Sequence, residues 1–295
     1  MNNRVLLIGN DINNATSDYS WSNLLTDLIS FAKIEVPSME NKPFPMFYEE
    51  IYLSSARKYG TKESRLKMYI AAKARRLVPN EIHKEILDLG IKTILTTNYD
   101  LTLEEVIAKD TRKLKNTGFI KESLYSLFRK NTVNDIDFWH IHGSELTPQS
   151  ITLGYEHYGG YLQQMRNYIV TGTKDNYKKK RFAPIQFRLK ENGIAHESWI
   201  DYFFTHDIDI IGLNFDFVEM HLWWLLTYRA RLKVTNSCEI NNKIRYFYPK
   251  KYATQSKHKL ELFKVNDVET IPIIMEGSDR IKYYKKVLKR IKGSH

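Results

Sequence analysis

Residues 93–102 read Thr-Ile-Leu-Thr-Thr-Asn-Tyr-Asp-Leu-Thr, and this stretch says more about the fold than any other. Its first half is β-branched and apolar, which predicts a buried strand. The strand gives way to Asn98 and Asp100, and Thr102 and Glu105 then have the spacing of a capping box at the start of a helix. In α/β proteins, the turns beyond the carboxyl ends of strands usually carry the ligand-binding side chains. The stretch therefore predicts an α/β fold with a site at this turn.

Other apolar runs along the chain also predict strands, and helical patterns separate them. We expect further strands at residues 4–9, 137–143, 151–154, 208–215, 244–248 and 268–274. The segments between them read as helical, with breaks at Gly60, Pro79 and Pro184, and a basic amphipathic helix closes the chain. Strands that alternate with helices favour an α/β class with a Rossmann-like parallel sheet and helices on both faces.

The first strand ends in Gly9 and leads into a turn-rich loop at residues 10–14. Apolar residues then recur at helical spacing at Trp21, Leu24, Leu25, Leu28 and Ile29. A strand, a glycine loop and a helix in this order are typical of a phosphate-binding unit. We expect a single domain over residues 1–295, with helical insertions at about 43–90 and 155–205 that form a cap.

Composition limits the class of protein. The content of 42% hydrophobic residues indicates a folded globule rather than a disordered chain. No run of eighteen apolar residues is present, and the apolar stretch at the start is too short for a signal peptide, so a cytoplasmic location is expected and no membrane association. The one cysteine, Cys238, excludes an internal disulfide and a cysteine-rich zinc site.

The net charge of +11 raises the possibility of nucleic-acid binding. Basic residues cluster at 178–181, 250–251 and 285–290, but these clusters lie far apart in the sequence and no nucleic-acid module surrounds them. A lysine-rich solvated surface, or a docking surface for an acidic protein, is the preferred interpretation. Direct nucleic-acid binding, as in a nuclease subunit, is the alternative, and it would depend steeply on salt.

The motifs of several common enzyme classes are absent from the sequence. There is no Gly-x-x-x-x-Gly-Lys phosphate loop, no His-Glu-x-x-His zinc motif and no Gly-x-Ser-x-Gly nucleophile elbow. Cys238 lies in a polar stretch without an obvious partner, which argues against a thiol nucleophile.

Several motifs resemble those of the sirtuin-like family of NAD-consuming domains. Residues 97–100 (Thr-Asn-Tyr-Asp) and His142-Gly143 are similar to two of the family motifs, and Pro79-Asn80-x-x-His83 is similar to a third. Residues 9–11 and 212–214 stand where the family binds the pyrophosphate and the adenosine ribose. The set keeps the family order from residue 5 to about residue 230.

Three departures from the family refine the expected activity. Asp11 replaces the second glycine of the phosphate loop, and Asn214 replaces a serine. The four zinc cysteines of the protein-deacetylating sirtuins are absent. Members without that zinc module resemble bacterial antiphage effectors that hydrolyse NAD to nicotinamide and ADP-ribose. The resemblance therefore implies an NAD hydrolase of an abortive-infection system, rather than a deacetylase.

The resemblance also implies roles for individual residues. The bond from nicotinamide to ribose breaks through an oxocarbenium-like state, so the site must activate water or a ribose hydroxyl and stabilise positive charge. Asn98 is expected to orient the ribose and the water, His142 to act as the general base, and Asp100 to support the nicotinamide end. NAD is then the substrate and no metal is expected. The cofactor-binding residues are expected to be Gly9, Asn10, Asp11, Thr97, Gly212 and Asn214.

Plainer interpretations of these residues stay open. Asn98 and Asp100 are also common turn and cap residues. His140, two residues before His142, either supports it or faces the core. His83 is expected to be structural, and the cluster at residues 155–158 (Tyr-Glu-His-Tyr) either lines the nicotinamide pocket or packs a helix.

Residues near the expected strand at 208–215 also have plain interpretations. His221, Trp223 and Trp224 recur at helical spacing and are expected in the core or at an interface. Asp207 and Asp209 are expected to flank the strand.

An alternative function for the chain as a whole is a catalytically silent module that senses NAD or ADP-ribose.

An enzyme that depletes NAD needs control. The catalytic fold and its insertions occupy nearly the whole sequence, so control is expected from self-assembly into a homo-oligomer or from a separate protein. The resemblance implies a HerA-type ATPase or, alternatively, a short Argonaute as that partner.

Overall fold

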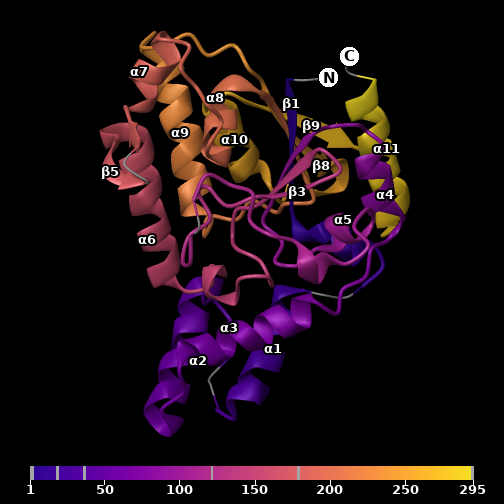
Figure 1. Cartoon of the computed structure of the whole chain (residues 1–295). Helices are drawn as coiled ribbons and strands as arrows, with labels where there is room; N and C mark the ends of the chain where they lie inside the picture. The colour runs from indigo at the N-terminus through magenta and orange to yellow at the C-terminus, as the bar shows by residue number, and fades with distance from the viewer. Residues whose placement is uncertain (1–2, 18–19, 36–37, 121, 178–179, 294–295) are drawn as a thin grey trace.

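The computed structural model describes residues 3–17, 20–35, 38–120, 122–177 and 180–293. Lys178 and Lys179 of the first basic cluster and the side chain of Trp21 lie outside the described part. A central sheet of seven strands organises the chain (Figure 1). Its strands, in spatial order, are β3 (Asn131–Val133), β4 (Ile136–His140), β2 (Thr93–Thr96), β1 (Arg4–Ile8), β7 (Asp207–Ile211), β8 (Ile244–Pro249) and β9 (Val268–Ile273).

The strand order reverses at β1. The chain runs from β1 to β2 and β4 on one side, and then to β7, β8 and β9 on the other. All these pairs are parallel, with Leu7 opposite Leu95 on one side and opposite Ile210 on the other, and only the short edge strand β3 is antiparallel. The predicted Rossmann-like parallel sheet is confirmed. Ligands of such sheets bind beyond the carboxyl ends of the strands at the reversal point, here between β1 and β7.

Alternate side chains of the central strands enter two different cores. Val5 and Leu7 of β1 pack on one face with α6 (Tyr155–Arg166), α8 (Tyr202–Thr205), α9 (Met220–Val234) and α10 (Lys257–Val265). Leu6 and Ile8 pack on the other face with α4 (Glu81–Leu87), α5 (Thr102–Glu105) and α11 (Arg280–Lys292). Because both faces are covered, these strands are largely apolar, which is why the sequence revealed them.

A third apolar core lies at one end of the molecule. It joins α1 (Trp21–Ala32), α2 (Phe44–Tyr59) and α3 (Glu63–Ala74), which Figure 1 shows as a helical lobe below the sheet. The predicted break at Gly60 is confirmed, since Gly60 ends α2 with φ of 66°. Tyr99 from the turn after β2 and Leu153 also enter this core, so the lobe packs directly against the region of the expected site.

Several local predictions were wrong. Residues 151–154 form no strand, because Thr152 N–H donates to the carbonyl of His142 and no strand of the described part of the chain pairs with the segment. The segment after α6 continues through a π-helix (Asn167–Thr171) into a hairpin of β5 (Thr173–Tyr177) and β6 (Lys180–Phe182), followed by α7 (Ile185–Lys190). The strand expected at 208–215 ends at Ile211, since Gly212 turns the chain with φ of 66°.

Short 3-10 helices complete the described structure. The first of them, Asn10–Ala15, replaces the loop expected after β1. The others are Thr111–Lys113, Pro148–Ser150, Trp199–Asp201 and Lys250–Tyr252. Within the described ranges, no helix has the length and apolar character needed to cross a membrane.

Candidate active site

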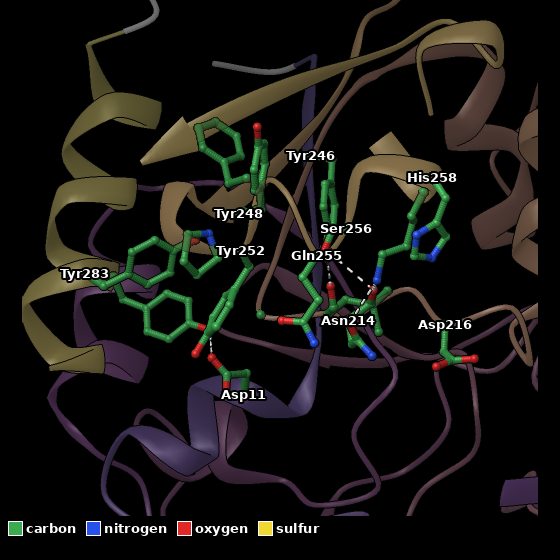
Figure 2. A pocket seen from close by; sticks show the side chains of 16 residues that line it. Asp11, Asn214, Asp216, Tyr246, Tyr248, Tyr252, Gln255, Ser256, His258 and Tyr283 are labelled. Atoms are coloured by element: carbon green, nitrogen blue, oxygen red, sulfur yellow. Dashed lines mark hydrogen bonds between the residues drawn. The ribbon is translucent and has the colours of Figure 1, made fainter. Parts of the chain in front are cut away.

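Two adjoining cavities open at the reversal point of the sheet. The larger, of about 690 Å³, lies between the loops that follow β1 and β7 and the first residues of α2 and α6. The smaller, of about 520 Å³, lies between the loop after β7 and the tyrosines of β8 and α11 (Figure 2). The residues that line both are Asp11, Gly212, Leu213, Asn214 and Asp216. Together the cavities form a two-part site along the carboxyl ends of the strands.

Most of the expected cofactor-binding residues line this site. Asn10, Asp11, Thr97, Gly212 and Asn214 all line the larger cavity. Gly9 does not, and the space beside it is filled by the neighbouring loop. A Cβ atom on Gly9 would lie 2.4 Å from the carbonyl oxygen of Gly212. The Gly9 N–H also donates to the carbonyl of Ile211 at 2.9 Å. Gly9 therefore lets the loops after β1 and β7 pack against each other.

Asp11, the departure in the phosphate loop, faces α11. Its carboxylate accepts from Arg280 Nε at 2.9 Å and from the hydroxyl of Tyr284 at 2.5 Å. Figure 2 shows Asp11 beneath the tyrosines at one end of the smaller cavity. Asn214, which also lines both cavities, accepts from Lys259 Nζ at 2.9 Å through its side-chain oxygen. Both departures thus bring a cation to the rim that the two cavities share.

The side chain of Asp100 is buried and bonded within the turn. Its Oδ2 accepts from Asn13 Nδ2 at 2.8 Å, and its Oδ1 accepts from the N–H and the hydroxyl of Thr102, the latter at 2.6 Å. The predicted capping box at Thr102 and Glu105 was wrong. Thr102 is the first residue of α5 rather than its cap, and Asp100 binds it because the carboxylate is two residues upstream. Asp100 lines neither large cavity, only a small recess that it shares with Asn98.

Asn13 connects this turn to the expected structural histidine. The Asn80 N–H donates to His83 Nδ1 at 3.0 Å, so Nε2 carries the proton and donates to Asn13 Oδ1 at 3.0 Å. Burial lowers the pKa of His83 below its usual value, so it stays neutral and keeps this hydrogen-bond pattern. The expected structural role of His83 is confirmed. The part played by Asn13 was not predicted, because only the fold brings the 3-10 helix after β1 against α4.

Asn98 differs from its neighbours in having an unpaired polar atom. The residue is 6% exposed, and its side-chain oxygen has no hydrogen-bond partner among the described residues. The Asn98 backbone, in contrast, is held firmly. Its N–H donates to the hydroxyl of Thr96 at 3.0 Å, and its carbonyl accepts from His140 Nδ1 at 2.9 Å. A rigid backbone and a free acceptor are what a ligand-binding amide needs.

His140 is the buried support of this turn. Its second nitrogen, Nε2, donates to Glu104 Oε1 at 2.8 Å. Burial by itself lowers the pKa of His140, but the Glu104 carboxylate and the bond to the Asn98 carbonyl outweigh it, and the pKa is raised above its usual value. His140 therefore acts on the position of Asn98 and does not reach either large cavity.

His142 lies on the wall of the larger cavity, two residues beyond the end of β4. Its Nε2 is 3.2 Å from Glu219 Oε2 and 3.1 Å from Nε2 of His221, both from the start of α9. His221 is fully buried, as a core residue would be, and it also contacts the candidate base, which was not predicted. Burial and the neighbouring His142 lower the pKa of His221 well below its usual value, so His221 is neutral.

The cluster at residues 155–158 combines the two interpretations that the sequence left open. Tyr155 and Tyr158 line the larger cavity, and the ring of Tyr158 meets that of His142 edge-on. His157 instead packs the helix, since it accepts from Gly154 N–H at the start of α6 and contacts Glu63 of α3 at 2.9 Å.

Asp207 and Asp209 were expected to flank the strand, but Asp207 is the first residue of β7 and Asp209 lies inside it. Arg245 Nε donates to Asp209 at 2.6 Å, and Arg4 lies 3.5 Å away. The carboxylate of Asp207 accepts from Lys243 N–H and Arg245.

One comparison with known proteins bears on this geometry. A family model described as the SIR2-like domain matches residues 92–192. The matched part contains β2, the turn with Asn98 and Asp100, β4 and His142. No curated protein matches the chain. The match supports a sirtuin-like domain here, is consistent with NAD-dependent enzymatic activity and implies that the domain binds or uses NAD.

Proposed function

We propose that this protein is an NAD glycohydrolase, which cleaves NAD to nicotinamide and ADP-ribose. The observation that carries the proposal is the position of His142 on the wall of the larger cavity, beside a small recess lined by Asn98, whose buried side-chain oxygen has no partner among the described residues. Thr97 lines both the cavity and the recess. The site lies at the reversal point of a Rossmann-like sheet, where dinucleotides bind.

The two-part cavity suits a molecule with two halves joined by a charged bridge. The nicotinamide half would occupy the larger cavity, near His142 and Tyr158, and the adenosine half the smaller one, among Tyr246 and Tyr248. The pyrophosphate would cross the shared rim. Lys259 there provides positive charge, and Arg280 lies against Asp11 and partly offsets its negative charge.

The chemistry then needs few groups. As the bond from nicotinamide to the ribose breaks, nicotinamide leaves as a neutral molecule and positive charge develops on the ribose. Water attacks the anomeric carbon, and His142 accepts its proton. Asn98 Oδ1 accepts a hydrogen bond from that water or from a ribose hydroxyl. The Glu219 carboxylate, 3.2 Å from His142 Nε2, stabilises the imidazolium that forms.

Hydrolysis is favoured over protein deacetylation by the composition of the chain. The sequence holds a single cysteine, so it lacks the four-cysteine zinc module that helps deacetylating sirtuins bind their peptide substrate. The biological role that follows from the resemblance is depletion of NAD as the effector of an antiphage abortive-infection system. A homo-oligomer, with a HerA-type ATPase or a short Argonaute as partner, would control it. Loss of cellular NAD during infection, only in cells that carry an active chain, is the test of that role.

The direct test is nicotinamide release from NAD by the purified protein beside its His142→Ala and Asn98→Ala variants. We expect release by the wild type and a loss of at least about 100-fold in each variant. Full activity in both variants, with unchanged folding, would refute the assignment of His142 and Asn98 to the catalytic site.

A second candidate, a silent module that binds NAD or ADP-ribose, is favoured by Asp11. A carboxylate stands where the family has a glycine, and Arg280 and Tyr284 fix it there. Binding of NAD without turnover, with and without the proposed partner, would select this alternative.

A further inference from the structure

Three side chains with lone pairs converge on one wall of the larger cavity. His142 comes from the end of β4, and Glu219 and His221 come from the start of α9. Donor atoms of the three residues all lie within 4.8 Å of one another. His142 and His221 are buried, and the side chain of Glu219 is 12% exposed. Two of the three residues, Glu219 and His221, lie outside the sirtuin motifs.

The hydrogen bonding of these groups is incomplete. Among the described residues, Glu219 Oε2 and His221 Nδ1 are buried without a hydrogen-bond partner. Nε2 of His142 and Nε2 of His221 face each other at 3.1 Å, and only one proton fits between them. A buried carboxylate oxygen without a donor has lost its hydration and gained no hydrogen bond in exchange, which is unfavourable. A cation between the three residues would remove that cost by accepting the lone pairs of both imidazoles and the carboxylate.

We propose that His142, His221 and Glu219 bind one divalent transition-metal ion of the Zn²⁺ class. In a tetrahedral zinc site with bonds of about 2.0–2.1 Å, neighbouring ligand atoms lie about 3.3 Å apart. The separations here are 3.1 Å between the two imidazole nitrogens and 3.2 Å between His142 Nε2 and Glu219 Oε2. The third pair is wider, with His221 Nδ1 3.9 Å from Glu219 Oε2. Two of the three separations already match the spacing that the ion needs, and binding requires the Glu219 carboxylate and His221 to move closer together.

The donor set also selects the kind of ion. Imidazole nitrogen suits Zn²⁺ and its neighbours, whereas Mg²⁺ and Ca²⁺ prefer an all-oxygen set. Three protein ligands leave a fourth position, and it faces the cavity because His142 and Glu219 both line it. The ion and a proton compete for the same lone pair of His142. Metal binding itself does not rest on the proposed hydrolysis of NAD.

The experiment uses the full chain, freed of metal by chelation and dialysis. It is titrated with Zn²⁺ alone in competition with a chromogenic chelator, and Mg²⁺ alone serves as the contrasting ion. We expect one Zn²⁺ per chain and no Mg²⁺ uptake at the same concentration. Substitution of Co²⁺ should give the visible absorption bands of a tetrahedral site.

Two variants test the ligands. Glu219→Gln and His221→Gln keep side chains of similar polarity, and each should weaken Zn²⁺ binding by more than about 100-fold, since loss of outer-shell partners alone costs about 10- to 100-fold. The matched control is His258→Gln, which removes an exposed histidine of α10 and should leave Zn²⁺ affinity unchanged. Circular dichroism and thermal unfolding without metal show whether each variant folds. If the variant His221→Gln fails to fold, the Zn²⁺ affinity of Glu219→Gln alone tests the proposal.

Absence of Zn²⁺ uptake by the wild type would overturn the proposal, and so would equal affinity in the wild type and Glu219→Gln. Nicotinamide release is measured on the same metal-free samples. Failure of metal binding and failure of NAD hydrolysis are therefore separate results.

Discussion

The substitution Asn98→Ala should separate function from stability. The side-chain oxygen of Asn98 is buried without a partner, and such an atom costs about 1–3 kcal/mol. Its removal returns that free energy. The void left by an amide group, roughly 40 Å³, costs about 1 kcal/mol at about 24 cal/mol per Å³. We expect the free energy of unfolding to stay unchanged or to rise by up to about 2 kcal/mol.

Asp100→Ala is the matched control, two residues along the same turn. Its carboxylate accepts from Asn13 Nδ2 and from two donors of Thr102. Loss of this acceptor leaves buried donors unsatisfied, each at about 1–3 kcal/mol, so we expect destabilisation of about 3 kcal/mol or more. Although Asn98 and Asp100 are similarly buried, we therefore expect Asn98→Ala to maintain or raise stability and Asp100→Ala to lower it.

Urea unfolding of the wild type and the two variants measures the stability change, and nicotinamide release measures function. Asn98→Ala should lose turnover by about 100- to 1,000-fold, the usual effect of removing one preorganised polar group. A loss of stability of about 3 kcal/mol in Asn98→Ala, comparable to that in Asp100→Ala, would show that the Asn98 amide is structural. Retained turnover would refute its ligand-facing role directly.

Three further predictions follow from the site. Gly9→Ala places a Cβ 2.4 Å from the backbone of Gly212, so unfolding studies should show destabilisation of about 3 kcal/mol or more. His140 has a raised pKa, so the stability it contributes is complete below its ordinary value of 6.5 and disappears as pH rises through the raised value. The difference in unfolding free energy between wild type and His140→Gln should therefore shrink toward alkaline pH; a difference that grows would contradict the Glu104 pairing. If both proposals hold, saturating Zn²⁺ should suppress nicotinamide release by occupying His142, and a chelator should restore it.

The central strands and most helices could be predicted from the sequence. Each central strand is buried on both faces, so most of its residues are apolar, and that pattern is visible in the sequence alone. Strands β3, β5 and β6 were not predicted, because β3 has only three residues and β5 and β6 lie in a segment whose composition reads as helical. Residues 151–154 alternate as a strand would, yet Ile151 and Leu153 enter the core of the helical lobe and no neighbouring strand pairs with them. Alternation of apolar and polar residues shows only that one side of a segment is buried. The fold decides whether a strand or a helical lobe covers that side.

The candidate site divides in the same way. The sequence by itself indicated that Asn98 follows one strand of a parallel sheet and that His142 lies near the end of another, because strand ends and their polar residues are local features. Only the tertiary structure decided that Asp100 bonds to Asn13 and that α9 brings Glu219 and His221 against His142. Those contacts join residues about 80 positions apart. Their energies depend on distances of a few ångströms that no local pattern encodes, so packing of the helices on the sheet sets the chemistry of this wall.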